Sequence, residues 1–386
     1  MKPVRPFFAI LVATLALFVG SGPAVAAPVW KLQATPNVGT TGTDLLGVSC
    51  PSVSTCTAVG VAYSATGSKT LAERWNGTSW SVQSTPNPTG AVFAALRAVS
   101  CPTATACMAV GDSKLSSGPA RPLAERWNGS TWTVKATPKP AGATTTAFSA
   151  VSCTSATACT AVGYFINGSG KRVPLAERWN GTQWVLQSVP VPAGATLSVL
   201  NGVSCASASA CTAVGYYTNS GGTNVTLVER WNGSAWSIQA TPNPTGATYS
   251  SLSAVSCSST TLCTAVGFFQ NSGSTAFTLA ERWNGTNWTV QSTPNPATAA
   301  NARLYGVSCK SATSCTAVGY WANASGSEFT LAERWNGTNW VVQSTPNVAG
   351  AAWNDLYAVG CSSALACTAV GASTDSVDET LALRYA

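Results

Sequence analysis

Short stretches in which apolar and polar residues alternate recur along the chain, and such alternation is typical of β-strands with one buried face. In the unit that begins near Ser251, four of these stretches follow one another, over residues 252–257, 263–269, 278–283 and 288–291. Asn284 and Gly285 tolerate the positive φ angles of a tight hairpin turn. Pro294 ends the fourth stretch because proline has no backbone N–H to donate to the hydrogen-bond ladder of a sheet. The pattern predicts an all-β fold made of four-stranded units.

The four-stranded unit recurs seven times. Its period is 51 or 52 residues, as the steps from Cys50 to Cys101 and from Cys101 to Cys153 illustrate. Repeats of this length with four short strands are the signature of a β-propeller, in which each unit forms one blade. We therefore expect a closed seven-bladed β-propeller with four antiparallel strands per blade.

The two ends of the chain each carry part of a unit. Residues 29–35 match fourth strands such as 288–293, whereas residues 380–385 match third strands such as 278–283. We therefore expect the last blade to be completed by the N-terminal strand, which closes the ring and removes an unpaired edge. An open solenoid is the alternative, but it would need polar end caps instead.

The first residues form a segment of a different kind. Lys2 and Arg5 precede an apolar run over residues 7–19, and residues 24–26 read Ala-Val-Ala, the pattern of a secretory cleavage site. We expect residues 1–26 to be a signal peptide and residues 27–386 to be a secreted, extracellular propeller. The apolar run is too short to span a membrane comfortably, so no membrane insertion is expected.

Fourteen cysteines recur as C-x5-C, and an even set in an exported chain predicts disulfides. Zinc binding is the alternative, but zinc sites use tighter spacing and usually histidine, of which the chain has none. We expect no metal and no cofactor. The predicted disulfides are Cys50–Cys56, Cys101–Cys107, Cys153–Cys159, Cys205–Cys211, Cys257–Cys263, Cys309–Cys315 and Cys361–Cys367.

Three short motifs accompany the repeat: Ala-Val-Gly in the second strand, Trp-Asn-Gly-Thr-x-Trp across the last hairpin, and Thr-Pro after it. With the strand order, they resemble kelch-type propellers and, more loosely, sialidase-like Asp-box and photosystem-assembly-factor propellers. The chain also resembles repeat proteins exported by high-GC Gram-positive, actinobacterial-type bacteria. The kelch double glycine is replaced here, as in Gly163-Tyr164, and the Asp-box acid by asparagine. The resemblance implies a propeller and transfers no active site.

The acidic residues offer no obvious reactive centre. The absence of histidine excludes the usual Ser-His-Asp and Cys-His arrangements. Six acids occupy one repeated position, namely Glu73, Glu125, Glu177, Glu229, Glu281 and Glu333. The other seven occupy scattered places, namely Asp44, Asp112, Glu328, Asp355, Asp375, Asp378 and Glu379. Glycoside cleavage needs paired carboxylates at a suitable separation, and nothing in this spacing indicates such a pair. We expect the chain not to be an enzyme.

Two repeated features have a structural interpretation and an alternative each. An arginine follows each repeated glutamate, which suggests ion pairs between neighbouring blades with one gap at Leu383. In the alternative, these side chains face solvent, where such pairs stabilise little. Two tryptophans such as Trp283 and Trp288 flank each hairpin turn and are expected to pack in the core, with sugar stacking as the alternative.

The repeats differ where strand two leads into strand three, on the face that usually carries a propeller's ligand site. Four successive units place two aromatic residues there. An aromatic wall of this kind is a candidate ligand site, although one residue of each pair must point into its blade. The candidate ligand-binding residues are Tyr164, Phe165, Tyr216, Tyr217, Phe268, Phe269, Tyr320 and Trp321.

The formal charge of +7 comes without a basic run, so nucleic acid is not an expected partner. A rigid ring with Ser-, Thr- and Asn-rich loops and aromatic residues suits sugars, which it can both stack on and hydrogen-bond. We expect a monomeric, kelch-like binding protein for extracellular or cell-wall carbohydrate. A protein-interaction scaffold and, third, a glycoside-processing enzyme are the alternatives. The enzyme would need two of the non-repeating acids to converge near Tyr or Trp.

Overall fold

The structure is a computed structural model that describes residues 28–386, so the predicted signal peptide of residues 1–26 lies outside the described residues. Every regular element in the described part is a β-strand, and none of it is a helix long and apolar enough to cross a membrane. The first three repeats form β2–β5 (Gly42–Ser52, Thr55–Ser64, Gly67–Trp75, Trp80–Gln83), β6–β9 (Ala91–Thr103, Ala106–Leu115, Arg121–Trp127, Trp132–Val134) and β10–β13 (Thr145–Ser155, Ala158–Ile166, Arg172–Trp179, Trp184–Gln187).

The later repeats follow the same order. They form β14–β17 (Leu197–Ser207, Ala210–Thr218, Asn224–Trp231, Trp236–Gln239), β18–β21 (Tyr249–Ser259, Leu262–Gln270, Ala276–Trp283, Trp288–Gln291) and β22–β25 (Asn301–Ser311, Ser314–Ala322, Glu328–Trp335, Trp340–Gln343). The last repeat contributes β26–β28 (Trp353–Ser363, Ala366–Thr374, Asp378–Tyr385), and the N-terminal segment contributes β1 (Trp30–Gln33).

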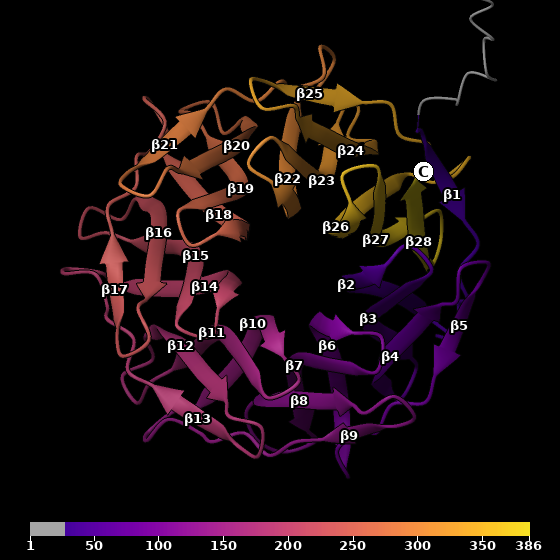
Figure 1. The fold of residues 1–386 in the computed structure, drawn as a ribbon, viewed down its shortest axis with the longest axis vertical. Coiled ribbons are helices and arrows are strands. Elements are labelled where there is room, and N and C mark those ends of the chain that lie inside the picture. The colour runs from indigo at the N-terminus through magenta and orange to yellow at the C-terminus, as the bar shows by residue number, and fades with distance from the viewer. Residues whose placement is uncertain (1–27) are drawn as a thin grey trace, which may run out of the picture.

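The strands form sheets that stand around a central opening, with the first strand of each repeat innermost and the fourth at the rim (Figure 1). Five sheets have four strands, and one has eight because β16 and β18 meet through a single parallel pair, Asn224 and Tyr249. None of the sheets in residues 28–386 closes on itself. Instead, β2 contacts β26, β27 and β28, so the first and last repeats lie side by side. The predictions of an all-β fold and of a propeller are confirmed.

The N-terminal strand completes the last sheet, as the ends of the sequence predicted. Strand β1 pairs with β28, and Trp30 lies opposite Tyr385. Thr380 donates its backbone N–H to Asn37 Oδ1 over 2.8 Å and its hydroxyl to Thr35 Oγ1 over 2.8 Å. The same threonine and asparagine contacts occur inside a single repeat, between Thr278 and its neighbours Thr293 and Asn295.

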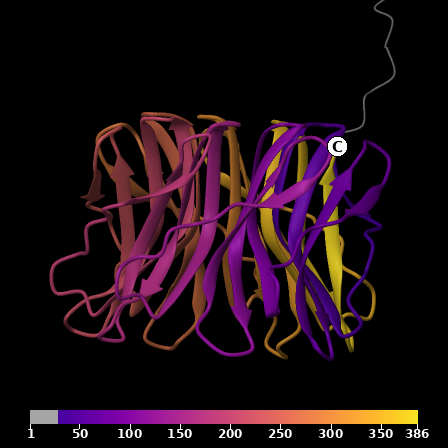
Figure 2. The ribbon, with the colours of Figure 1, turned by 90° about the horizontal axis from the view of Figure 1, so that it is seen from below.

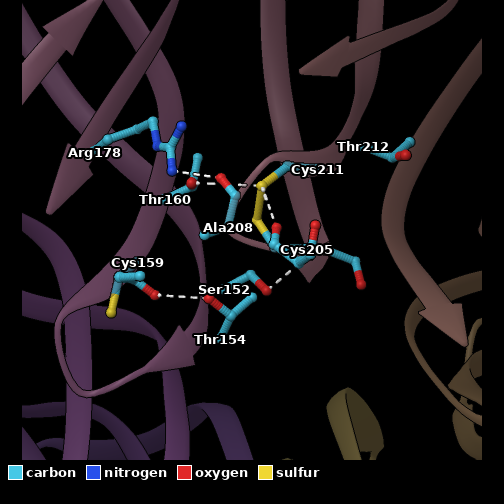
Figure 3. The surroundings of a disulfide bond; sticks show 12 residues. Ser152, Thr154, Cys159, Thr160, Arg178, Cys205, Ala208, Cys211 and Thr212 are labelled. Atoms are coloured by element: carbon cyan, nitrogen blue, oxygen red, sulfur yellow. Dashed lines mark hydrogen bonds between the residues drawn. A yellow bond between two sulfur atoms is a disulfide. The ribbon is translucent and has the colours of Figure 1, made fainter. Parts of the chain in front are cut away.

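All fourteen cysteines form the predicted disulfides within the repeats, and none is free in the described chain. Each bridge joins the first two strands at the face opposite the strand two–three loops. Figure 3 shows how one bridge also meets the preceding repeat: Ser152 Oγ accepts the Cys205 N–H over 3.0 Å, and Thr160 Oγ1 lies 3.6 Å from Cys211 Sγ. The cysteine hairpins therefore also bind neighbouring sheets to each other.

The proposed ion pairs between repeated Glu and Arg are wrong. The six glutamates are 0% exposed, which also contradicts the solvent-facing alternative, and within residues 28–386 the one ion pair joins Arg97 and Asp112. Six of the seven repeated arginines donate to backbone carbonyls of the next repeat, as Figure 3 shows for Arg178 and Ala208.

The offset between neighbouring sheets explains this failure. The carboxyl of Glu125 meets Thr70 of the preceding repeat, whereas Arg74, four residues further along that strand, lies 5.3 Å from the ring centroid of Trp127. Four residues of a strand span about 13 Å, so the carboxyl and the guanidinium enter the same interface at different heights. The repeated tryptophans are themselves buried in pairs, such as Trp283 and Trp288 with ring centroids 5.8 Å apart, and act as core.

Figure 2 shows the strands running between two faces of the ring that carry the connecting loops. The pairing register sets what each face holds. In β14 and β15, Cys205 lies opposite Cys211 at one end and Leu197 opposite Thr218 at the other, where the chain turns toward strand three. We call the face at this second end, with the loops between strands two and three, the loop face.

Candidate functional site at the mouth of the central channel

A β-bulge in the first strand of every repeat aims one side chain into the central channel. The bulge leaves this residue, the bulge residue, without a partner in strand two, and a bulge commonly re-aims a side chain in this way. The bulge residues line a central cavity of 170 Å³. They are Leu46, Arg97, Ser149, Asn201, Ser253, Tyr305 and Tyr357.

The glycine of the repeated Ala-Val-Gly motif makes room for this bulge. A Cβ atom on Gly267 would lie 2.0 Å from the carbonyl oxygen of Ser251 on the first strand, which no side chain can occupy. The glycine at this position is therefore a requirement of the close strand approach. The motif fixes where a channel-facing residue occurs but leaves its identity free.

The bulge residues make the channel one-sided. Tyr305 and Tyr357 come from consecutive repeats, and their ring centroids are 5.9 Å apart. Tyr305 is also 5.8 Å from the ring of Tyr320 on β23. The channel therefore has an aromatic side at β22 and β26, opposite the small polar side chains Ser149 and Asn201.

An aromatic row continues from this side across the neighbouring repeats. Tyr249 stacks on Phe268 with ring centroids 5.3 Å apart, and lies 6.0 Å from Tyr216 of the preceding repeat. The Arg303 guanidinium lies 4.3 Å from the centroid of Phe268 and is also a neighbour of the Tyr305 hydroxyl. We call this set, from Tyr216 to Tyr357, the aromatic row.

The eight candidate residues divide into two groups, as the alternation of a strand requires. The second residue of each pair packs inward against a hydrophobic cluster, and Trp321 for example stacks on Phe329 with centroids 4.6 Å apart. These inward residues are Phe165, Tyr217, Phe269 and Trp321. Of the first residues, Tyr216, Phe268 and Tyr320 join the aromatic row, although Tyr320 is only 8% exposed. Tyr164 stands apart from the row, with Arg172 over its ring at 5.0 Å.

Two carboxyl groups meet at the channel mouth beside this row. Glu328 begins β24 and is fixed against β26, because its N–H donates to Ala352 O over 3.0 Å and its carbonyl faces the Asn354 amide. Burial and then the neighbouring Glu328 carboxyl raise the pKa of Asp355 to about 7, against smaller opposing effects of Tyr357 and Arg303. Burial also raises the pKa of Glu328. Each of the two carboxyls therefore keeps its proton to a higher pH than an isolated carboxyl does.

A second acidic group adjoins the first across the junction of the last and first repeats. Tyr63 donates a 3.1 Å hydrogen bond to Asp44 Oδ2. Burial and the nearby Asp378 raise the pKa of Asp44. Burial, and then the charges of Asp355 and Asp44, raise the pKa of the Tyr357 hydroxyl, so this phenol stays protonated.

The expectation that the non-repeating acids are scattered is wrong. Six of the seven belong to three adjacent repeats, and Asp112 is instead held by Arg97 over 2.6 Å. Sequence reasoning also missed the inner-strand members of the site, namely Tyr249, Arg303, Tyr305 and Tyr357. The sequence signal was partial. At the position of Arg303 the other repeats carry Asp, Ala, Ala, Val, Ser and Asp, so the arginine departs from the repeat, whereas the positions of Tyr249, Tyr305 and Tyr357 differ from repeat to repeat and single out no residue.

Comparison with known proteins identifies the fold. No family model and no curated protein matches the chain, so the kelch, Asp-box and actinobacterial resemblances have no support from sequence families. The WD40 β-propeller domain of Doa1 is similar at a TM-score of 0.54 and 9% identity, covering 92% of this chain and 97% of that chain. A polysaccharide lyase, an ulvan lyase bound to -[GlcA(1-4)Rha3S]-, is similar at 0.55 and 11%, covering 90% and 95%. The six-bladed fucose lectin of Aleuria aurantia aligns at 0.46 and 11%, covering 81% and 99%.

The expectation that the chain is not an enzyme is contradicted. An ulvan lyase shares the fold over nearly its whole length, so the propeller itself gives no ground for excluding catalysis. The argument from scattered acids fails as well, because Glu328 and Asp355 converge beside tyrosines. At 11% identity the likeness concerns the fold alone.

Proposed function

We propose that this chain is a secreted, closed propeller of seven blades that binds extracellular carbohydrate at the mouth of its central channel. The proposed blade number is supported by the seven sequence repeats, if the eight-stranded sheet counts as two blades beside the five four-stranded sheets. Secretion is favoured by the predicted signal peptide and by the disulfides, which persist in oxidising compartments.

One observation carries the proposal: the aromatic row and the Glu328–Asp355 pair break the repeat at the same place. A repeated side chain that packs identically in each blade needs no ligand to explain it. The aromatic row, in contrast, occurs only in the repeats from β15 to β26. It ends beside the carboxyl oxygens of Glu328 and Asp355, which can accept hydrogen bonds. A sugar ring offers apolar faces to aromatic rings and hydroxyls to such acceptors, which is the combination a ligand site needs.

A pair of matched variants tests this site. Phe268→Ala removes a ring of the aromatic row, whereas Tyr164→Ala removes the ring at the same repeat position outside the row. In a glycan-array screen followed by titration, we expect Phe268→Ala to weaken binding by about tenfold or more, equivalent to about 1.4 kcal/mol. Tyr164→Ala should leave binding unchanged. Equal effects of the two variants, or no glycan bound by the folded protein, would contradict the proposal and leave a protein partner as the alternative.

A second candidate function is cleavage of the bound carbohydrate. It is favoured by Asp355, whose pKa of about 7 suits a general acid at neutral pH. In this role the Asp355 carboxyl would give its proton to the departing glycosidic oxygen while a water molecule adds to the anomeric carbon and yields the new reducing end. New reducing ends released by the wild-type protein and lost in Asp355→Asn would support cleavage. Unchanged glycan chain lengths after long incubation would leave recognition alone.

A further inference from the structure

The charge at the channel mouth differs in sign from that of the chain as a whole. The chain carries +7, yet four non-repeating acids lie near Tyr357 at the junction of the sixth, last and first repeats. They are Asp44, Asp355 and Asp378, whose charges raise the pKa of the Tyr357 hydroxyl, and Glu328, which lies beside Asp355. Among the cations, Arg303 adjoins the pair of Glu328 and Asp355, while Arg97 is engaged by Asp112. The exposed Lys69 lies on β4 of the first repeat. Even with these three cations, the mouth has an excess of acids.

This excess of acids limits which class of sugar the channel mouth can bind. A uronate or a sulfated sugar would bring another negative charge to carboxyls that already repel each other, and sites for such ligands use arginine clusters instead. Asp355 Oδ1 is buried and accepts no hydrogen bond from residues 28–386, so its capacity as an acceptor is unused. The mouth therefore suits a ligand with positively charged donors.

A metal ion is the simplest positive ligand, but the arrangement does not suit one. Residues 28–386 contain no group of three or more Asp, Glu, Cys or His side chains placed to hold a metal. A hard cation such as calcium needs six to eight oxygen ligands around it. An organic ammonium needs fewer, because each N–H finds its own acceptor.

Trp353 supplies an independent observation. Its side chain is 53% exposed, whereas every other tryptophan in the described residues is buried or half-buried. It begins β26 on the loop face and lies two residues before Asp355, on the same side of the strand. Its ring lacks the burial that explains the repeated tryptophans. An exposed indole beside carboxylates is an arrangement that attracts ammonium groups through its π face.

We propose that the glycan bound at the mouth carries free amino groups, as in a polymer of glucosamine, with an ammonium between Asp355 and Trp353. This inference rests on the proposed carbohydrate function and names the class of sugar. The sugar rings lie along the aromatic row, and the amines neutralise the acidic junction. Because the attraction is electrostatic, binding weakens as salt is added.

Titration of the mature protein with matched oligomers tests the inference. The probes are a glucosamine oligomer, the N-acetylglucosamine oligomer of the same length, and a galacturonate oligomer. We expect the glucosamine oligomer to bind about tenfold or more tightly than its acetylated form, which has the same ring but no charge. The galacturonate oligomer should not bind. Asp355→Asn should remove the preference for the amine, and Trp353→Ala should weaken binding, whereas Trp353→Phe should retain most of it.

The outcomes separate the two proposals. If the acetylated oligomer binds as tightly as the free amine, or the galacturonate binds best, the amine inference is overturned while carbohydrate recognition stands. If no oligomer binds, both proposals fail. If Asp355→Asn keeps the full preference for the amine, another acid attracts the ammonium group, and the proposed position of the ammonium at Asp355 is overturned. Unfolding curves of each variant show whether a loss of binding reflects a loss of fold.

Discussion

The hairpins at the rim and the inner strands at the channel mouth belong to the same repeats but follow opposite rules. At the rim, each repeat carries the same tryptophan pair and the same buried glutamate, with Leu383 and Tyr385 as the departures in the last repeat. At the mouth, the bulge position changes from leucine to arginine, serine, asparagine and tyrosine around the ring. Repeated positions therefore hold sheets together, and positions that differ are free to recognise a ligand.

The comparison predicts its largest stability effect at the rim. Trp283→Ala removes a buried ring between sheets and should lower the free energy of unfolding by about 3–5 kcal/mol. Chemical denaturation monitored by circular dichroism measures this loss. Molecules that remain folded should bind the glycan as the wild type does, and a large loss of affinity in the folded fraction would break the division between the two regions.

The disulfides should contribute a smaller, local share. Replacing Cys205 and Cys211 together by serine opens a short loop, which in the chain-entropy model costs about 2 kcal/mol. The midpoint of denaturant unfolding under non-reducing conditions measures the effect. A loss above that of Trp283→Ala would mean that the bridges, rather than the packed rings, hold neighbouring sheets together.

Because of the buried glutamates, we expect the folding stability to depend on pH in an unusual direction. Burial raises the pKa of Glu281 to about 8, from an ordinary value of 4.5. Between these values the folded state keeps a proton that the unfolded state has lost. Stability is therefore fully present below about pH 4.5 and falls as the pH rises toward 8, by up to about 1.4 kcal/mol per pH unit for each such carboxyl.

Glu281→Gln isolates this contribution because it keeps the shape and removes the titration. Relative to the wild type, the variant should gain stability steadily as the pH rises through this window, as thermal unfolding in a pH series would record. A wild type and a Glu281→Gln variant with parallel pH profiles would refute the account of the buried carboxyls.

The mouth should show the smallest stability effect and the largest functional one. Tyr357→Phe removes one half-buried hydroxyl and should change the free energy of unfolding by about 1 kcal/mol or less. It should still weaken glycan binding measurably, because the hydroxyl adjoins Asp355. Calorimetric titration beside thermal unfolding separates the two quantities. Unchanged binding would move the site away from the channel.

The fold was predictable from the sequence because the same four-stranded pattern occurs in every repeat. Even the completion of the last sheet by residues 30–33 could be predicted, because the N-terminal segment matches a fourth strand and the last repeat lacks one. The repeated glutamate and arginine were misjudged for a physical reason. Adjacency in sequence gives their side of the strand, but the offset between neighbouring sheets decides which groups meet across the interface.

The site was harder to predict because its parts meet through pairing geometry. Asp44 and Asp378 stand at opposite ends of the chain, and the ring arrangement brings them together. Tyr305 and Tyr357 point into the channel because a bulge reverses the alternation there, which periodicity alone does not locate. Of the candidate aromatic residues of strand two, alternation sends one of each pair into the core, as the sequence analysis expected, and a ligand-binding role for the others stays a prediction.

Hydrogen exchange of the protein with and without a saturating bound glycan tests the division between rim and mouth most directly. The account predicts slowed exchange in the inner-strand segments 249–253, 301–305 and 353–357, and no change in the hairpins over residues 231–236 and 283–288. Protection confined to those hairpins, with unchanged exchange in the three inner segments, would contradict it and place ligand recognition at the rim.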